Sequence, residues 1–182
     1  MKQAIFVVAS VAVMATAITA TAQDPFGFMP KGGAELLAEV LAGCARCEKL
    51  SDLAARKRTA EEWRRYFDQT GVLSKLSAKE VETLTRYLAV NFPARNIQDA
   101  RSLPRSGRAI VIQYCGLCHS MAVPMTQARD PAQWQGFKQR PPHEMVGLSS
   151  TEWEELANYL AINAPIPVDR IPEQLRQGAG GY

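Results

Sequence analysis

Apolar residues recur at spacings of three and four along most of the chain, which places them on one face of an α-helix. The clearest runs are Leu36, Leu37, Val40 and Leu41, then Val81, Leu84 and Leu88, and finally Trp153, Leu156 and Leu160. The strict alternation of apolar and polar residues that a half-buried strand requires does not occur. The pattern therefore predicts an all-α fold in which these faces are turned toward a core.

Residues that cap helices indicate where several of them begin. A Ser or Thr followed three positions later by Glu forms a capping box, in which each side chain bonds the other residue's backbone N–H. The sequence contains three such pairs, Thr59 with Glu62, Ser77 with Glu80, and Ser149 with Glu152. Asp130 followed by Pro131 predicts a further start, because proline fits the first position of a helix. Pro93 and Pro165 should end the last helix of each half.

The second half of the chain repeats the first. A shift of 71 residues superposes Cys44 on Cys115, Cys47 on Cys118, Arg58 on Arg129 and Trp63 on Trp134. One further residue of shift places LSAKEVETLTRYLAVNFP, residues 76–93, over LSSTEWEELANYLAINAP, residues 148–165. Self-similarity at one offset indicates an internal duplication. The sequence therefore predicts two tandem helical domains of the same design.

The predicted domains span residues 34–93 and 109–165. Between them, residues 94–108 are polar and contain one proline and one glycine, which suits a linker. Residues 23–33 are rich in proline and glycine and should form an extended leader. Residues 166–182 also contain prolines, end in glycines, and should form an extended tail.

Residues 1–22 have the pattern of a secretory signal peptide. Lys2 precedes an apolar run that ends in small residues, with cleavage expected after Ala22. The competing interpretation is an uncleaved membrane anchor, but the run is close to the lower length limit for a span and is diluted by three hydroxyl-bearing residues. We therefore expect a periplasmic protein, exported and soluble, with no membrane span after cleavage.

The formal net charge of the chain is +3, from 21 basic and 18 acidic residues. A balance this close to neutral argues against nucleic acid as a partner. A local cluster of basic residues could still guide docking to an acidic protein surface.

The sequence CGLCH, residues 115–119, is the clearest chemical signal in the chain. Two cysteines three apart, followed by histidine, are typical of covalent haem attachment. On a helical turn Cys115 and Cys118 share one face, so both thiols can reach the two vinyl groups at one edge of a porphyrin. His119 then lies where its imidazole can bind the iron. We interpret the motif as the attachment site of one haem c.

Two other interpretations of a paired-cysteine motif fit the chain less well. A structural zinc site needs four ligands, whereas the chain has two histidines and four cysteines, with no second pair close in sequence. A thioredoxin-type dithiol is expected within a βαβ pattern, which the sequence lacks.

The order of the CGLCH motif, Trp134 and the helix ending in YLAIN resembles that of the cytochrome c family, specifically an exported protein of two tandem class I-like domains. The resemblance covers residues 34 to about 165 and is strongest in the second copy. It implies that Cys115 and Cys118 form the thioether bonds and that His119 is the proximal iron ligand. It also implies that the final helix packs across the first helix of its domain.

Arg129 and Trp134 are weaker candidates for haem contacts. In the resembling family a guanidinium or an indole N–H near this place often bonds a haem propionate, and charge-assisted bonding would justify it. Arg58 and Trp63 occupy the same positions in the first copy, however, so packing explains both pairs at least as well.

Three methionines follow His119 in the second copy and are candidates for the distal iron ligand. Met121 and Met125 follow too closely to reach the opposite face of the ring. Met145 lies in the loop before the last helix, where small class I cytochromes c present this ligand, and it is the distal ligand that we expect. His143 is the alternative, and a bis-histidine site would have a lower reduction potential.

The first copy has CARCE where the second has CGLCH, so Glu48 replaces the proximal histidine. Both histidines belong to the second copy, and no methionine follows Cys47 in the first. We therefore expect a degenerate domain without haem, with Cys44 and Cys47 joined as a disulfide or, alternatively, present as free thiols. Glu48 should face water, and Tyr66 or Phe67 should fill the space that the porphyrin leaves.

These inferences lead to an expected function. One covalent haem with both axial positions filled leaves no site for a substrate, so the protein should be an electron carrier without enzymatic activity of its own. It would transfer single electrons from an exported dehydrogenase to an acceptor cytochrome or oxidase. The alternatives are a tightly bound electron-transfer subunit of a periplasmic dehydrogenase complex and a haem peroxidase, with His143 as the acid–base group above an open iron position.

Overall fold

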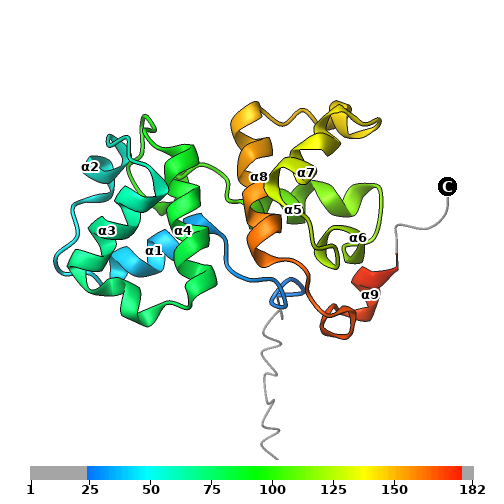
Figure 1. Ribbon diagram of the computed structural model, residues 1–182, viewed down its shortest axis with the longest axis horizontal. Helices are drawn as coiled ribbons and strands as arrows, with labels where there is room; N and C mark the ends of the chain where they lie inside the picture. Colours follow the sequence, from blue (N-terminus) through cyan, green and yellow to red (C-terminus); the bar gives the residue numbers. More distant parts are fainter. Residues whose placement is uncertain (1–23, 178–182) are drawn as a thin grey trace, which may run out of the picture.

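The computed structural model describes residues 24–177, and Figure 1 shows their course. This part of the chain is helical and contains no β-strand, which confirms the predicted all-α fold. Its α-helices are α1 (Gly33–Ala42), α2 (Leu50–Ala54), α3 (Ala60–Thr70), α4 (Ala78–Asn91), α5 (Gly107–Tyr114), α6 (Ala122–Met125), α7 (Pro131–Gln135), α8 (Ser150–Asn163) and α9 (Glu173–Arg176). Short 3₁₀ helices lie at Val72–Lys75, Ala100–Ser102, Cys115–Leu117, Gly136–Gln139, His143–Val146 and Val168–Arg170.

Two predictions concern membrane passage. The signal peptide predicted for residues 1–22 lies outside the described residues. Among residues 24–177, no helix is both long and apolar enough to cross a lipid bilayer.

The helix starts follow the predicted caps. α3, α4 and α8 begin after Thr59, Ser77 and Ser149, each of which forms a capping box with the Glu three residues on. α7 begins at Pro131, directly after the N-cap Asp130. α4 and α8 each have 14 residues and stop two residues before the predicted prolines. Local sequence therefore sets the limits of the helices that frame each half.

The helices divide into two groups, each with its own apolar core. α1–α4 form the first half of the molecule, drawn in blue to green in Figure 1, and α5–α9 form the second half. The core of the first half includes the aromatic residues Trp63, Phe67, Tyr87 and Phe92. The core of the second half includes Ile110, Met125, Tyr159 and Leu160. Separate cores allow the two halves to be compared position by position.

The same close helix contact occurs in both halves. α1 packs against α4 at Gly33, where an added Cβ would lie 2.1 Å from the Cβ of Tyr87. α5 packs against α8 at Gly107, where an added Cβ would lie 2.2 Å from the Cβ of Tyr159. A side chain at either position would collide with the tyrosine, so only glycine allows the helices to approach this closely.

α4 and α8 pack against each other and join the two halves (Figure 1). Asn163 Nδ2 donates to Thr83 Oγ1 at 3.1 Å, and the equivalent Asn91 Nδ2 lies 3.5 Å from Glu155 Oε2. The buried Glu155 carboxyl also accepts the N–H of Gly107 at 2.8 Å. The contact between the halves is therefore tight and includes buried polar groups.

Segments near both ends of residues 24–177 contribute to the second half. Within the predicted leader, residues 24–29 form turns rather than an extended segment. Three of their side chains pack against the second core: Phe26, Phe28 and Met29. Within the predicted tail, Ile171 is fully buried and the Leu175 carbonyl accepts the N–H of Met121 at 3.0 Å. Segments outside the predicted domain limits are thus packed parts of the second half.

Candidate functional site

The CGLCH motif lies where α5 ends. α5 continues into a 3₁₀ turn at Cys115–Leu117, which brings Cys115, Cys118 and His119 to the wall of one cavity. The two thiols are free, with Cys115 partly buried and Cys118 exposed. Burial raises the pKa of the Cys115 thiol to about 12, so this thiol is protonated at neutral pH. The motif therefore presents two thiols and one imidazole to the same space.

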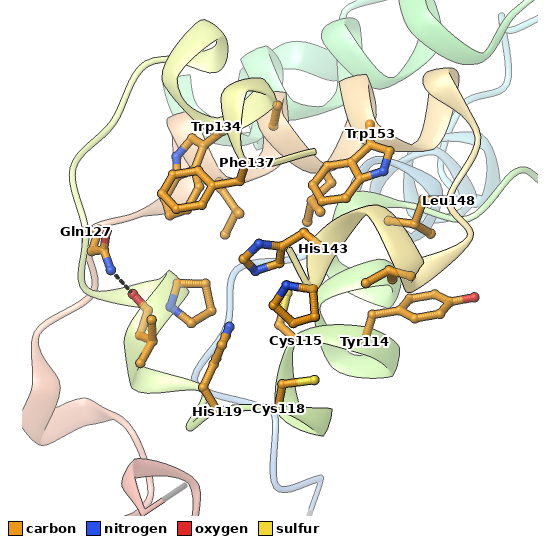
Figure 2. Close-up of a pocket in the computed structure, with 17 residues that line it drawn as sticks. Tyr114, Cys115, Cys118, His119, Gln127, Trp134, Phe137, His143, Leu148 and Trp153 are labelled. Atoms are coloured by element: carbon orange, nitrogen blue, oxygen red, sulfur yellow. Dashed lines mark hydrogen bonds between the residues drawn. The ribbon is translucent and has the colours of Figure 1, made fainter. Parts of the chain in front are cut away.

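The cavity has a volume of about 330 Å³. This volume lies within the range of cofactor and small-ligand sites. Figure 2 shows the side chains that line it, which come from α5, α6, α7, α8 and the loops between them. Most are apolar, among them Trp134, Phe137, Trp153, Leu156 and Leu160. Such a lining favours a ligand with a large apolar surface.

His119 is oriented by a hydrogen bond to the backbone. Its Nδ1 lies 3.1 Å from the carbonyl oxygen of Ser120. Because a carbonyl can only accept, Nδ1 carries the proton and Nε2 keeps a free lone pair. Figure 2 shows the ring pointing into the cavity. A backbone carbonyl that fixes the tautomer in this way is typical of metal-binding histidines.

His143 faces His119 within the cavity (Figure 2) and is carried by the 3₁₀ helix at His143–Val146. The centres of the two imidazole rings are 6.4 Å apart, with 61° between the ring planes. An imidazole nitrogen binds a metal at about 2 Å and lies about 1 Å from its ring centre, so two rings that share one metal have centres about 6 Å apart. The observed separation fits one metal ion between the rings.

Met145, the distal ligand expected from the sequence, is placed differently. Its side chain is 82% exposed and does not line the cavity, although it follows His143 by only two residues. One 3₁₀ turn therefore directs the histidine inward and the methionine outward. Met121 and Met125 are buried in the core of the second half and do not line the cavity either. The geometry favours the alternative ligand, His143.

Two buried nitrogen atoms at the cavity have no hydrogen-bond partner within the described residues. They are Trp134 Nε1 and His143 Nδ1. Buried polar groups are nearly always paired. Trp63 Nε1, the equivalent atom of the first half, is also buried and unpaired, so the Trp134 atom alone does not indicate a ligand. The Arg129 guanidinium lies over the rings of Trp134 and Phe137, at 5.6 and 5.0 Å from their centres, and donates to Gln127. The guanidinium thus packs on two rings that line the cavity, without lining the cavity itself.

The residues present fit a covalently attached haem. Two thiols, a fixed imidazole, a second imidazole at a metal-sharing distance and an apolar lining surround one cavity. By contrast, residues 24–177 contain no group of three or more His, Cys, Asp or Glu side chains that could hold a metal ion by itself.

In the first half, aromatic side chains occupy the place next to Trp63 that is open next to Trp134. A separate pocket of about 340 Å³ lies beside Cys44, Cys47 and Glu48, and none of these aromatic side chains lines it. Cys44 and Cys47 form a disulfide, as expected from the sequence. Trp63 and Phe67 are fully buried and stack with their ring centres 6.1 Å apart. Phe92 packs edge-on against Trp63 at 6.0 Å. Phe67 is one of the two predicted filling residues, and Phe92 joins it.

Glu48 departs from the sequence-based expectation. Its side chain is half-buried instead of facing water, because its carboxylate lies 3.8 Å from Arg56 Nε and 3.9 Å from Arg58 Nη2. The Arg58 guanidinium also lies 4.7 Å from the ring centres of both Trp63 and Tyr66. The positive charges offset the cost of partly burying the acid. Where the second half has an imidazole facing a cavity, the first half has an ion pair.

Sequence reasoning missed residues that separate the two halves. At the positions of Val81, Thr85 and Phe92 in the first half, the second half has Trp153, Ala157 and Ala164. Trp153 and Ala157 both line the cavity, and Phe92 fills the first core. A comparison of side-chain size at each aligned position contains this signal. The changes from Thr85 to Ala157 and from Phe92 to Ala164 leave space, whereas the change from Val81 to Trp153 adds a large apolar side chain to the cavity wall.

The interpretation of this site rests on its own residues and their geometry. The chain matches no protein-family model, and no curated protein and no solved structure matches it.

Proposed function

We propose that this chain is a periplasmic c-type cytochrome that carries one covalent haem and transfers single electrons between an exported oxidoreductase and a respiratory acceptor. The observation that carries the proposal is the cavity at the CGLCH motif, in which the rings of His119 and His143 face each other at 6.4 Å. Together with the two thiols, these rings supply every protein bond that a covalent, six-coordinate haem needs.

Each residue of the site has a definite role in this proposal. Cys115 and Cys118 form the thioether bonds, and His119 is the proximal ligand. His143 is the distal ligand, because its ring lines the cavity whereas Met145 is exposed. Met145 could take that place only if the turn at His143–Val146 rotated. Two imidazole ligands give a lower reduction potential than a histidine and a methionine.

The bound haem would supply the one-electron chemistry, and the chain holds, orients and shields that group. The Ser120 carbonyl keeps His119 oriented, and the apolar lining limits access of water. Trp134 Nε1, which is buried and unpaired, would donate to an acidic group of the haem, and the Arg129 guanidinium packs on the ring of Trp134. With imidazoles on both sides, no position remains for a substrate. This favours an electron carrier over a peroxidase.

We also propose that the two halves are copies of one cytochrome c-like domain, of which only the second binds haem. The matching contacts of Gly33 with Tyr87 and of Gly107 with Tyr159 support a common design. The stacked aromatic core of the first half supports loss of the cofactor there. A half without a cofactor site suits a docking role, so the chain could also serve as the electron-transfer subunit of a larger periplasmic complex.

Visible spectroscopy combined with a redox titration tests this function. The exported protein, produced in a host that attaches c-type haem, should be red and show one reversible one-electron transition. Its spectrum should be that of a low-spin, six-coordinate haem, and cyanide should bind slowly because it must first displace an imidazole. A colourless protein would overturn the haem assignment. Rapid cyanide binding to an open iron position would favour a peroxidase instead.

A further inference from the structure

α8 separates the cavity from a buried acid. Trp153, Leu156 and Leu160 line the cavity on one face of the helix. Glu155 lies on the opposite face, because successive residues of a helix are rotated by about 100°. Its carboxyl is buried against α4 and the first residue of α5. The acid and the cavity are thus separated by one helix, which has a diameter of about 10 Å.

The surroundings of Glu155 make its negative charge costly. The side chain is 2% exposed. Its Oε1 accepts the N–H of Gly107 at 2.8 Å, and Asn91 Nδ2 lies 3.5 Å from Oε2. Among the described residues, no lysine or arginine forms an ion pair with it. A buried carboxyl without a cation is stable in its neutral form up to an unusually high pH.

The neighbouring acidic groups also raise the pKa of Glu155. The titratable groups that act on Glu155 are Glu35 from α1, Tyr87 from α4, and Glu154 and Tyr159 from α8. Arg108 from α5 faces Glu35 and Tyr159. Arg108 is already engaged, at 3.0 Å from Asp24 and 3.8 Å from Glu35. Burial, with smaller repulsion from Glu35 and Glu154, outweighs the hydrogen bond from Gly107 and raises the pKa of Glu155 to about 8. The carboxyl can therefore exchange its proton close to neutral pH.

We propose that Glu155 is a proton site coupled to the redox centre of the cavity, taking up a proton when that centre is reduced and releasing it when the centre is oxidised. This inference rests on the proposed function of the cavity. On reduction, the donor protein supplies one electron and solvent supplies one proton to the carboxylate. On oxidation, the electron passes to the acceptor and the proton returns to solvent, so charge is balanced across the cycle.

The coupling has an electrostatic cause. The oxidised centre carries one more positive charge than the reduced centre, and a positive charge on the far side of α8 favours the Glu155 anion. Both groups are buried, so salt screens their interaction less than it screens charges on the surface. Reduction removes the positive charge and leaves the neutral carboxyl as the preferred form.

The first half provides a natural comparison. Thr83 stands at the position equivalent to Glu155, and its hydroxyl accepts from Asn163 Nδ2 at 3.1 Å. A threonine hydroxyl does not titrate in this pH range. The proton site is thus confined to the half that has the cavity.

Redox titration of the haem-loaded protein between about pH 5 and pH 10 tests the coupling. The wild-type potential should fall as pH rises, by up to about 59 mV per pH unit for one proton per electron. Glu155→Gln should keep its haem and lose this slope, and Glu155→Thr should do the same, because threonine is accommodated at the equivalent position. Glu154→Gln removes one of the acids that repel the Glu155 anion, so it should keep the slope and move it to slightly lower pH.

A second measurement reports on the carboxyl without using the potential. The pKa of Glu155 is 4.5 in the unfolded chain and about 8 in the folded protein. Between these two pH values the unfolded chain loses the proton first, so the free energy of unfolding should fall as the pH rises. Urea unfolding should show this fall in the wild type and not in Glu155→Gln. Two results would overturn the inference and leave the haem assignment intact. One is a wild-type reduction potential that does not change with pH, and the other is a pH dependence that Glu155→Gln leaves unchanged. A protein without haem overturns both the inference and the haem assignment.

Discussion

The two halves of the molecule contain similar helices arranged around different centres. In the first half, Trp63, Phe67 and Phe92 meet in a closed aromatic core. In the second half, the equivalent region is a cavity of about 330 Å³ into which two imidazoles point. The difference shows that one helical frame can be completed either by its own side chains or by a space suited to a large apolar group.

Few substitutions account for this difference. Large side chains at Phe67 and Phe92 stand where the second half has Lys138 and Ala164, and Glu48 stands in place of His119. The filled core and the acid in place of the imidazole occur in the same half. A domain that loses a cofactor loses much of its core, so replacing that volume with side chains restores packing.

The two cysteine pairs offer the sharpest contrast between the halves. Changing both Cys115 and Cys118 to serine should abolish covalent haem, because no thiol remains to form a thioether at the cavity. Changing both Cys44 and Cys47 to serine should leave the haem content unchanged, because that disulfide lies in the filled half. Haem staining of denatured protein measures both results. Loss of haem from the Cys44 and Cys47 variant would contradict the assignment.

The two residues of the turn that precedes α8 provide a second contrast. His143→Ala should open an axial position, convert the spectrum from low spin to high spin and make cyanide binding fast. Met145→Ala should leave the spectrum and the potential unchanged, since its side chain is 82% exposed. Visible absorption and electron paramagnetic resonance distinguish the two variants. The reverse result would show that the turn rearranges when haem is bound.

Removing an aromatic side chain should destabilise the first half, with its closed core, more than the second half, with its cavity. Phe67→Ala should lower the free energy of unfolding by about 3–5 kcal/mol, because it leaves a cavity in a closed core. Phe137 aligns with Tyr66, the neighbour of Phe67. Phe137→Ala should lower the free energy of unfolding by less, about 1–2 kcal/mol, because that ring is only half-buried. Urea unfolding measures both values, and equal losses would argue against a closed first core.

The smallest change expected is that of Glu48→His. Restoring the CxxCH motif should not add a second haem, because Cys44 and Cys47 are joined as a disulfide and the first half has no second histidine to face the new imidazole. The substitution removes a partly exposed ion pair and should alter stability by no more than about 1 kcal/mol. The haem-to-protein ratio and the unfolding midpoint check this. A ratio that doubles would show that the missing histidine alone keeps haem from the first half.

Much of the fold follows from local sequence. The capping boxes at Thr59, Ser77 and Ser149 and the N-cap at Asp130 are found where they were predicted, because each depends on residues within one helical turn. The CGLCH segment also lies at the end of a helix beside an apolar cavity. Short-range signals of this kind can be recognised in the sequence without knowledge of the rest of the chain.

Features that depend on distant contacts were harder to predict. Which of His143 and Met145 faces the cavity depends on how one short turn packs against the helices around it. The packing of Met29 on the second core depends on the path of a segment that precedes the first half. Glu48 is half-buried because two arginines lie near it in space. Neither periodicity nor capping residues carry such information.

The central claim is that haem is attached only to the second half. Its most direct test is the haem-to-chain ratio from a pyridine haemochrome assay, combined with mass spectrometry of peptides from protein matured in a host that attaches c-type haem. The account predicts one haem per chain, on the peptide that contains Cys115 and Cys118, and a disulfide on the peptide that contains Cys44 and Cys47. Two haems per chain, or none, would contradict it.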